Sequence, residues 1–350
     1  MELLLVSGVG GSGVSSVARG LARGFRDAGL STAEVNSAVS APIESSSLWS
    51  DAVDTFGVWL QGLGAASMAA DELVGLAGLN ELITGGLVAD AVANPNIDVV
   101  IWDMGSTREA LRILQLLDTV PMLLDRLLTG PAAAQLSAPE PAALIAAWYR
   151  LVNHVVAARD DIRAATCVLV GETRDVPELV SVAGVLRLYD CVTSAVVLNK
   201  VKETHLATSK KQSKSSRQSG QEAALIDQEF GVPVVRLPFR DTRGPKVSKT
   251  AVRLRPLCKL LKDLPRNSGP VWSVSAVKKD YTFTFPLYRG ADIRVGRRGD
   301  SLLLVCDGQR RQLELPAVLK RCLITGGGMN GASLVLRFAP DPKVWRDSRE

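Results

Sequence analysis

The stretch Ser7–Ser16, SGVGGSGVSS, contains four glycines between an apolar run, Glu2–Val6, and a helical stretch, Ser15–Ala28. The apolar run predicts a buried strand, and Ser15 or Ser16 is expected to cap the helix that follows. Glycines let backbone N–H groups approach phosphate oxygens, and the N-terminus of a helix adds a positive dipole. A strand, a glycine-rich turn and a helix in this order therefore predict a phosphate-binding loop. The alternative interpretation is a structural turn that binds no ligand.

The first 265 residues alternate between strand-like and helix-like patterns. The run Ile97–Asp103, IDVVIWD, is almost continuously apolar, as expected for a parallel strand that is buried on both faces. The other strand-like runs are Ser31–Asn36, Thr166–Val170, Ser194–Leu198 and Val232–Leu237, and helical patterns cover Leu48–Ala91, Thr107–Leu128 and Pro141–Arg159. This alternation predicts an α/β domain over residues 1–265, with a mostly parallel sheet, helices on both faces and a helical subdomain.

Three later regions differ in composition from this α/β pattern. Residues 202–220 are polar and rich in Ser, Lys and Gln, which predicts a mobile basic loop at the ligand-binding edge of the sheet. Residues 266–278 are expected to form a linker. Between residues 279 and 340, apolar and polar residues alternate with period two, and glycine-containing turns separate the runs. This pattern predicts a small all-β sandwich.

The composition limits the chemistry that the chain can perform. A formal net charge of +5 over 350 residues is mild and does not predict a nucleic-acid partner. The five cysteines lie far apart and only two histidines are present, so neither a zinc site nor a His-based catalytic triad is expected. No run reaches the roughly 18 apolar residues of a membrane span. The N-terminus predicts a strand rather than a signal peptide, so a cytoplasmic protein without stable membrane insertion is expected.

The glycine-rich stretch resembles the deviant phosphate-binding loop, GKGGVGKTT, of the ArsA and guided-entry ATPases within the MinD/ParA group. The matching residues are Gly8, Gly10, Gly11 and Gly13 for the glycines, Ser12 between them, and Ser15 and Ser16 for the two threonines. Val9 and Val14 stand where the family has its signature lysine and its loop lysine. The resemblance implies a loop that binds ATP or ADP, with Ser15 as a magnesium ligand. Because the loop lysine stabilises charge in the transition state of phosphoryl transfer, hydrolysis is expected to be impaired.

Further positions resemble functional residues of the same family. Asp103 falls on the Walker B acid, which would hold magnesium together with Ser15. Ala38 falls on the water-activating aspartate of the first switch. Asn199 matches the asparagine that reads adenine, and Pro238 matches a proline of the segment that closes over the base. From the residues alone, Asp103 can equally be a polar strand end, and Asn199 can equally cap a turn.

The C-terminal region resembles the α-crystallin-like domain that is appended to some bacterial and plastid ArsA relatives. The resemblance is most specific at Gly299–Leu304 and at Arg310–Leu319, which follows the pattern RRxLxLPxxL. Together with the preceding positions, the resemblance covers about the whole chain.

These resemblances imply a catalytically impaired ArsA-like ATPase homologue, or pseudo-ATPase. It is expected to act in a homodimer, or in a heterodimer with an active paralogue, and to handle an apolar protein client or transport-associated work. Apolar residues within 56–92 and 111–155 could shape a client groove or could be ordinary core. Two alternatives stay open. One is a slow but active ATPase whose missing charge comes from Lys200, Arg108 or a partner, and the other is a non-enzymatic chaperone or scaffold that uses its β-domain.

Overall fold

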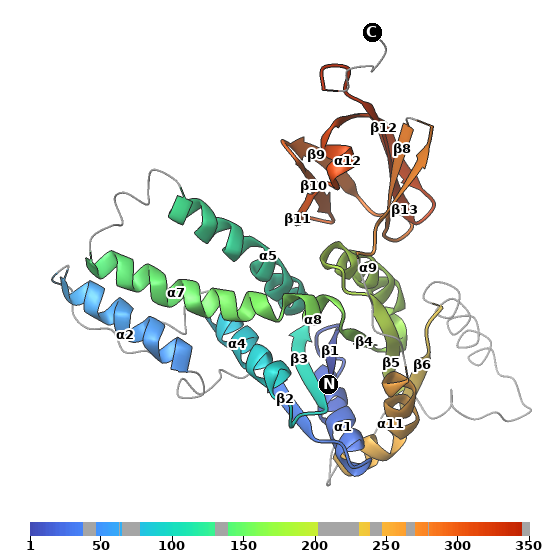
Figure 1. Cartoon of the computed structure of the whole chain (residues 1–350). Helices are drawn as coiled ribbons and strands as arrows, with labels where there is room; N and C mark the ends of the chain where they lie inside the picture. Colours follow the sequence, from blue (N-terminus) through green and yellow to red (C-terminus); the bar gives the residue numbers. More distant parts are fainter. Residues whose placement is uncertain are drawn as a thin grey trace, which may run out of the picture.

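The computed structural model describes residues 1–37, 47–62, 64, 78–129, 139–201, 231–238, 247–263, 270–278 and 280–344. Two predicted features, Ala38 at the first switch and the basic loop 202–220, lie outside these residues. The described residues form a six-stranded sheet flanked by helices, and two smaller antiparallel sheets that make up a second domain, the β-domain (Figure 1).

The larger domain is built on strands in the order β2-β3-β1-β4-β5-β6, and every neighbouring pair is parallel. These strands are β1 (Glu2–Gly8), β2 (Thr32–Asn36), β3 (Val99–Ser106), β4 (Thr166–Gly171), β5 (Thr193–Val201) and β6 (Val234–Pro238). β1 lies inside the sheet and is buried along almost its whole length. The carboxyl ends of β1, β3, β4 and β5 therefore meet at one edge of the sheet. The predicted α/β fold is confirmed.

Helices cover both faces of this sheet because successive side chains of a strand point to opposite faces. The described helices of this domain are α1 (Val14–Asp27), α2 (Ser47–Gly62), α4 (Leu79–Ala93), α5 (Thr107–Thr129), α7 (Pro139–Ala157), α8 (Arg159–Arg163), α9 (Val176–Leu186) and α11 (Val247–Lys262), with short turns η2 (Thr173–Asp175) and η3 (Arg187–Tyr189), and not all of them lie on the sheet. Leu4 and Val6 of β1 share one buried core with α1 and α11. Leu3 and Leu5 share the opposite core with α5 and α9.

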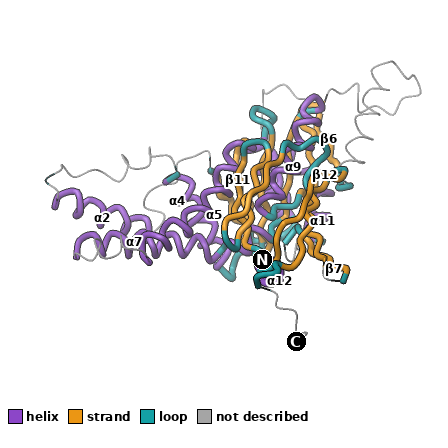
Figure 2. Tube along the Cα trace, turned by 90° about the horizontal axis from the view of Figure 1, so that it is seen from above, coloured by secondary structure: helices purple, strands orange, loops and turns teal. Residues whose placement is uncertain are grey.

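A helical subdomain extends from one side of the sheet. Figures 1 and 2 show α2 and the outer parts of α5 and α7 projecting away from the strands. Trp49 of α2, Ile83 of α4 and Leu151 of α7 form a separate buried cluster that holds these helices together. Among the helices that the structure describes, none combines the length and apolar character that crossing a membrane requires.

The β-domain contains a three-stranded sheet, β11-β10-β9, and a four-stranded sheet, β12-β13-β8-β7. Its elements are β7 (Ser273–Val277), β8 (Asp280–Pro286), β9 (Ile293–Arg298), β10 (Ser301–Cys306), β11 (Gln309–Glu314), α12 (Ala317–Lys320), β12 (Cys322–Asn330) and β13 (Ser333–Pro340). Phe283, Phe285, Leu302, Leu304 and Phe338 are buried in its core. The predicted all-β region is present as two antiparallel sheets.

Two local predictions are corrected by the structure. Part of the predicted linker, Ser273–Val277, is strand β7, whose Val274 pairs with Phe283 of β8. The alternation in SVSAV is short, but pairing with an existing strand supplies the hydrogen bonds that a linker would lack. The helix after the glycine-rich turn begins at Val14, and its N-cap is Gly13 without a side-chain cap, so neither serine caps it. The N-cap residue has a positive φ, which glycine adopts and serine rarely does.

All five cysteines are buried and free. Burial raises the pKa of the Cys167 thiol to about 12 and that of Cys258 to about 11. These thiols therefore stay protonated near neutral pH and are poor nucleophiles.

Candidate functional site

The loop between β1 and α1 depends on two glycines. A Cβ added to Gly8 would lie 1.8 Å from the carbonyl oxygen of Val170, so only glycine lets β1 approach β4 this closely. The next residue, Val9, donates its N–H to that same oxygen at 2.9 Å. Gly13 has a φ of 95°, in the left-handed region, and begins the turn into α1 at Val14. A side chain at position 8 would therefore clash with β4, and a side chain at position 13 would strain the turn into α1.

The outer part of the loop is open. Gly10 and Gly11 are exposed, and a Cβ on either glycine would have no heavy atom within 4 Å. Backbone N–H groups beside open space at the start of a helix suit an anion such as phosphate. The loop geometry is therefore compatible with the predicted ligand, and it does not depend on a side chain to create the space.

The end of β5 ties the loop down from the other side. Asn199 donates from its amide nitrogen to the carbonyl oxygen of Ser12 at 2.7 Å, and a Cβ on Gly13 would lie 2.5 Å from the same nitrogen. Lys200 follows with a φ of 56° and donates from Nζ to the carbonyl oxygen of Gly11. The same Nζ pairs with Glu172 Oε1 at 2.8 Å. Asn199 therefore has a role in holding the loop, and its reading of adenine stays a prediction.

Ser12, Ser15 and Ser16, the serines that follow Gly8 in the stretch, face different surroundings. Ser12 is buried, and its hydroxyl donates to the carbonyl oxygen of Val170 at 3.2 Å while its N–H donates to that of Val9 at 3.1 Å. Ser15 is half-buried and Ser16 is exposed in the first turn of α1. The side chain of Ser12 therefore serves the loop itself, and Ser15 keeps the place predicted for a magnesium ligand.

The two valines at the predicted lysine positions pack into apolar surroundings. Val14 is buried in the core that α1 shares with β1 and α11, and Val9 is half-buried against the core on the opposite face. Neither side chain can supply charge or a hydrogen bond. Lys200 is the cation that the described structure brings to this loop, and Glu172 neutralises it.

The end of β3 lies beside the loop. Val6 pairs with Asp103 across β1 and β3, and Asp103 is buried with its Oδ1 accepting the N–H of Gly105 at 3.1 Å. Thr107, the first residue of α5, donates its hydroxyl to the carbonyl oxygen of Gly8 at 2.9 Å. Ser7 donates its hydroxyl to Gly105 at 3.3 Å. The Walker B-like strand end and the glycine-rich loop are thus joined by hydrogen bonds from both sides.

Two further predicted positions lie at the same edge. Pro238 ends β6 and pairs with Val201, two residues after Asn199. Ser37, just before Ala38, receives the indole N–H of Trp102 on its hydroxyl at 2.8 Å. Its carbonyl oxygen also accepts the side-chain amide of Asn80. Two hydrogen bonds therefore hold Ser37, the residue just before the predicted first switch.

The predicted magnesium ligands do not form a closed metal cage. Within the residues that the structure describes, no group of three or more His, Cys, Asp or Glu side chains is placed to hold a metal ion. One hydroxyl, Ser15, and one carboxylate, Asp103, suit Mg²⁺, which commonly binds one or two protein oxygens together with phosphate oxygens. The donor set fits a metal that arrives with a nucleotide and does not fit a dedicated metal site.

Some polar contacts were not predicted from the sequence. Lys200 was named as a possible source of charge, but its pairing with Glu172 at the end of β4 was not predicted, nor was the contact of Asn80 in α4 with Ser37. Arg311 was also missed, although the sequence holds a signal for it. It stands in β11 on the same period-two row as the buried Leu313, where a strand of a sandwich points inward.

Comparison with protein-family models places both domains. A model described as the anion-transporting ATPase (ArsA) matches residues 24–243, which is more than half of the chain. A model described as the HSP20-like domain found in ArsA matches residues 278–338. The ATPase match begins within α1, so the glycine-rich loop itself lies outside the matched residues.

The chain is also similar to individual proteins, two by sequence and one by structure. Protein Rv2184c of Mycobacterium tuberculosis is 24% identical over 327 residues, which cover 85% of this chain and 76% of that protein. The uncharacterized protein SCO2128 of Streptomyces coelicolor is 42% identical over 53 residues, or 15% of this chain and 14% of its own length. The crystal structure of the cell division protein FtsY from Thermotoga maritima aligns with a TM-score of 0.37 and 14% identity, over 73% of this chain and 68% of that one. By the match over more than half of its length, the chain belongs to the anion-transporting ATPase (ArsA) family, and it carries the family's HSP20-like domain.

Proposed function

We propose that this ArsA family member is a pseudo-ATPase, which holds a nucleotide through its loop backbone but hydrolyses it poorly or not at all. The observation that carries the proposal is the state of Val9 and Val14. Both stand at positions where the family has lysines, and both pack into apolar surroundings. Loss of one such charge contact costs several kcal/mol of transition-state stabilisation, or roughly 10²–10³ in rate. ATP or ADP with Mg²⁺ is the proposed ligand.

The residues that remain support binding better than catalysis. The loop offers open backbone at Gly10 and Gly11, Ser15 would face the metal, and Asp103 lies at the end of the neighbouring strand. Bound Mg²⁺ would neutralise phosphate charge that the missing lysines leave unpaired. Asn199 and Pro238 lie at the same edge, where the base is expected.

A second candidate, a slow but active ATPase, has one observation in its favour. Lys200 places its Nζ on the carbonyl oxygen of Gly11, so a cation is present at the loop although it comes from β5. Against this candidate, the ammonium is already paired with Glu172 at 2.8 Å. A lysine that keeps this partner delivers little net charge to a phosphate, so the pseudo-ATPase is the favoured function.

The helical subdomain supports work as a dimer subunit that handles an apolar client. Val58 of α2, Leu123 of α5 and Tyr149 of α7 are 59%, 55% and 42% exposed, on three helices of the projecting subdomain. A contiguous exposed apolar patch is typical of interaction sites, and these three side chains are apolar groups that such a patch would use. We propose an apolar protein segment as client and an ArsA-like paralogue, or a second copy of the chain, as partner.

The test separates binding from hydrolysis. Isothermal titration calorimetry of the full chain with ATP and Mg²⁺ is expected to show weak binding. Phosphate release by the isolated chain is expected to stay at background, and to rise only when an active paralogue is added. Release at an ordinary P-loop rate by the chain alone would reject the pseudo-ATPase. No binding at millimolar ATP, alone or with the paralogue, would favour a non-enzymatic scaffold that uses its β-domain.

A further inference from the structure

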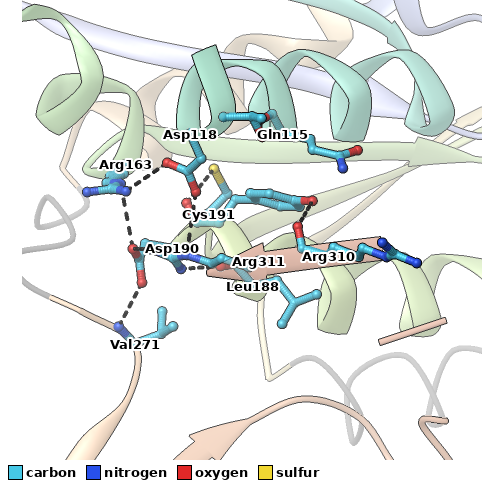
Figure 3. A network of polar contacts seen from close by, with 11 residues as sticks. Gln115, Asp118, Arg163, Leu188, Asp190, Cys191, Val271, Arg310 and Arg311 are labelled. Atoms are coloured by element: carbon cyan, nitrogen blue, oxygen red, sulfur yellow. Dashed lines mark hydrogen bonds and ion pairs between the residues drawn. The ribbon is translucent and has the colours of Figure 1, made fainter. Parts of the chain in front are cut away.

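A network of charges, with Arg311 and Asp190 buried and Asp118 and Arg163 half-buried, joins the two domains (Figure 3). Arg311 of β11 has 5% of its side chain exposed and contacts Asp190 Oδ2, while its Nε lies 3.5 Å from Asp118 Oδ2. Arg163 of α8 completes the set, with Nη2 3.0 Å from Asp118 Oδ1 and Nε 3.6 Å from Asp190 Oδ2. The N–H of Val271, just before β7, donates to Asp190 Oδ1 at 3.4 Å. Two arginines and two aspartates therefore balance one another where the β-domain meets the larger domain, at a site we call the junction.

The contacts around the junction fix the β-domain in place. Arg187 donates from Nη1 to the carbonyl oxygen of Leu287 at 2.8 Å, and the hydroxyl of Tyr189 donates to the carbonyl oxygen of Arg310 at 3.1 Å. The ring of Tyr288 lies so close to Gly184 that a Cβ there would be 2.4 Å from it. The core on this face of the six-stranded sheet continues into the β-domain without interruption. The domain is thus docked by both apolar packing and buried charge.

One helix touches both the junction and the glycine-rich loop. At its first residue, Thr107, α5 donates a hydrogen bond to Gly8, and the N–H of Ser106 just before it is held by Glu109 at 2.6 Å. Asp118 lies eleven residues further along the same helix (118 − 107), or about 16 Å at 1.5 Å per residue. From Thr107 to Asp118, before its internal proline Pro121, α5 connects the two places as one helix.

We propose that α5 couples the β-domain to the glycine-rich loop, so that docking of the β-domain at the junction steadies the loop. By the reciprocity of linked equilibria, an anion bound at the loop also strengthens docking. The coupling needs no large movement, because a small shift of a rigid helix changes contacts at both ends. The part that concerns the anion rests on the proposed function, whereas the coupling between loop and junction does not.

Hydrogen–deuterium exchange of the full chain tests the coupling without a ligand. Arg311→Met and the milder Arg163→Gln are expected to speed exchange of amides 8–16 by roughly fivefold or more. The matched control is Arg310→Met, because its side chain is exposed on the same strand. A second control, Phe338→Leu, loosens the core of the β-domain away from the junction. Both controls should leave amides 8–16 within about twofold of the wild type.

The reverse experiment starts from the loop. Thr107→Val removes the hydroxyl that bonds Gly8, and it is expected to speed exchange at residues 186–191 and 309–314. Thr119→Val is the control on the same helix, because its hydroxyl bonds only Gln115 one turn earlier. Faster exchange at the mutated end alone, in both directions, would overturn the coupling. An equal effect of Phe338→Leu on amides 8–16 would also overturn it, since global loosening would then explain the result.

Calorimetry with ATP and Mg²⁺ tests the part that concerns the ligand. Arg311→Met is expected to weaken ATP binding, because docking of the β-domain and anion binding at the loop are proposed to be linked equilibria. Equal affinity in the wild type and Arg311→Met would overturn this part. If the wild-type chain binds no ATP, the proposed function fails, while the two exchange experiments still decide whether loop and junction are coupled.

Discussion

The glycine-rich loop and the junction use charge in opposite ways. At the loop, the two predicted lysine positions hold the buried Val14 and the half-buried Val9, and Lys200, which contacts the loop from β5, is paired with Glu172. At the junction, Arg311 and Asp190 are almost fully buried and face each other directly. In the described part of the chain, the charges at the junction pair across two domains, whereas the charge at the loop is paired within the larger domain. This contrast agrees with the proposed pseudo-ATPase.

The largest effect is expected from breaking the junction. Arg311→Met leaves Asp190 and Asp118 with one cation fewer, and removing one partner of a buried pair costs about 3–5 kcal/mol of unfolding free energy. Urea unfolding should show this loss, and Arg310→Met should stay within about 0.5 kcal/mol because its side chain is exposed. A loss below about 1 kcal/mol in Arg311→Met would show that the junction is not a tight ionic cluster.

The next effect is expected from blocking the loop's close approach to β4. Gly8→Ala places a Cβ 1.8 Å from the carbonyl oxygen of Val170, so β1 and β4 must separate. We expect a loss of about 2–3 kcal/mol in unfolding free energy. Gly10→Ala is the matched control, because a Cβ there meets nothing within 4 Å. Equal unfolding free energies of the two variants in urea would show that β1 and β4 can accept a methyl group at position 8, against this prediction.

A smaller effect is expected from the ties at the end of β5. Asn199→Ala removes the hydrogen bond to the carbonyl oxygen of Ser12 and should cost about 1 kcal/mol. Lys200→Ala breaks a pair whose lysine is 35% exposed, so it should cost less than about 1 kcal/mol. The midpoint temperatures of thermal unfolding of the two variants show which of the two contacts stabilises the fold more. A larger loss from Lys200→Ala would indicate that the lysine, and not the asparagine, holds the loop.

The smallest effect is expected on ATP hydrolysis when a lysine is placed at the predicted loop-lysine position. Val14→Lys should not restore ATP hydrolysis, because Ala38 is predicted to stand where the family has its water-activating aspartate. The buried surroundings of Val14 also favour an apolar side chain over a charge. Phosphate release by this variant should match that of the wild type, with Val14→Met as a control for side-chain size. Full hydrolysis by Val14→Lys would show that the predicted register of the first switch is wrong.

Local patterns predicted much of the fold. The apolar run Ile97–Asp103 is the buried strand β3, and the alternating C-terminal stretch folds as antiparallel sheets. The predicted serine cap was wrong because the N-cap position has a positive φ, which Gly13 adopts easily. The general preference for serine at N-caps takes no account of this backbone conformation. The predicted linker held a strand because Val274 finds its partner, Phe283, in the neighbouring β8.

The candidate site was predictable only in part. The glycines, Asp103 and Asn199 could be placed near one another because the ends of parallel strands meet at one edge of a sheet. The directions of the side chains could not be predicted. Only the structure shows that the Ser12 hydroxyl points inward to Val170 and that Asn199 holds the loop. Whether Ala38 occupies the switch position stays a prediction, because that residue lies outside the described part of the chain.

The sequence by itself determined that this chain has a glycine-rich turn between a strand and a helix, valines at two positions where the family has lysines, and two domains of different class. These follow from residue type and spacing, which are local. Only the tertiary structure decided that Val14 is buried in a core and Val9 packs against the opposite one, that Lys200 reaches the loop already paired, and that Arg311 meets Asp118 and Asp190. Those contacts join residues 28 to 193 positions apart (200 − 172 and 311 − 118), so no local pattern contains them.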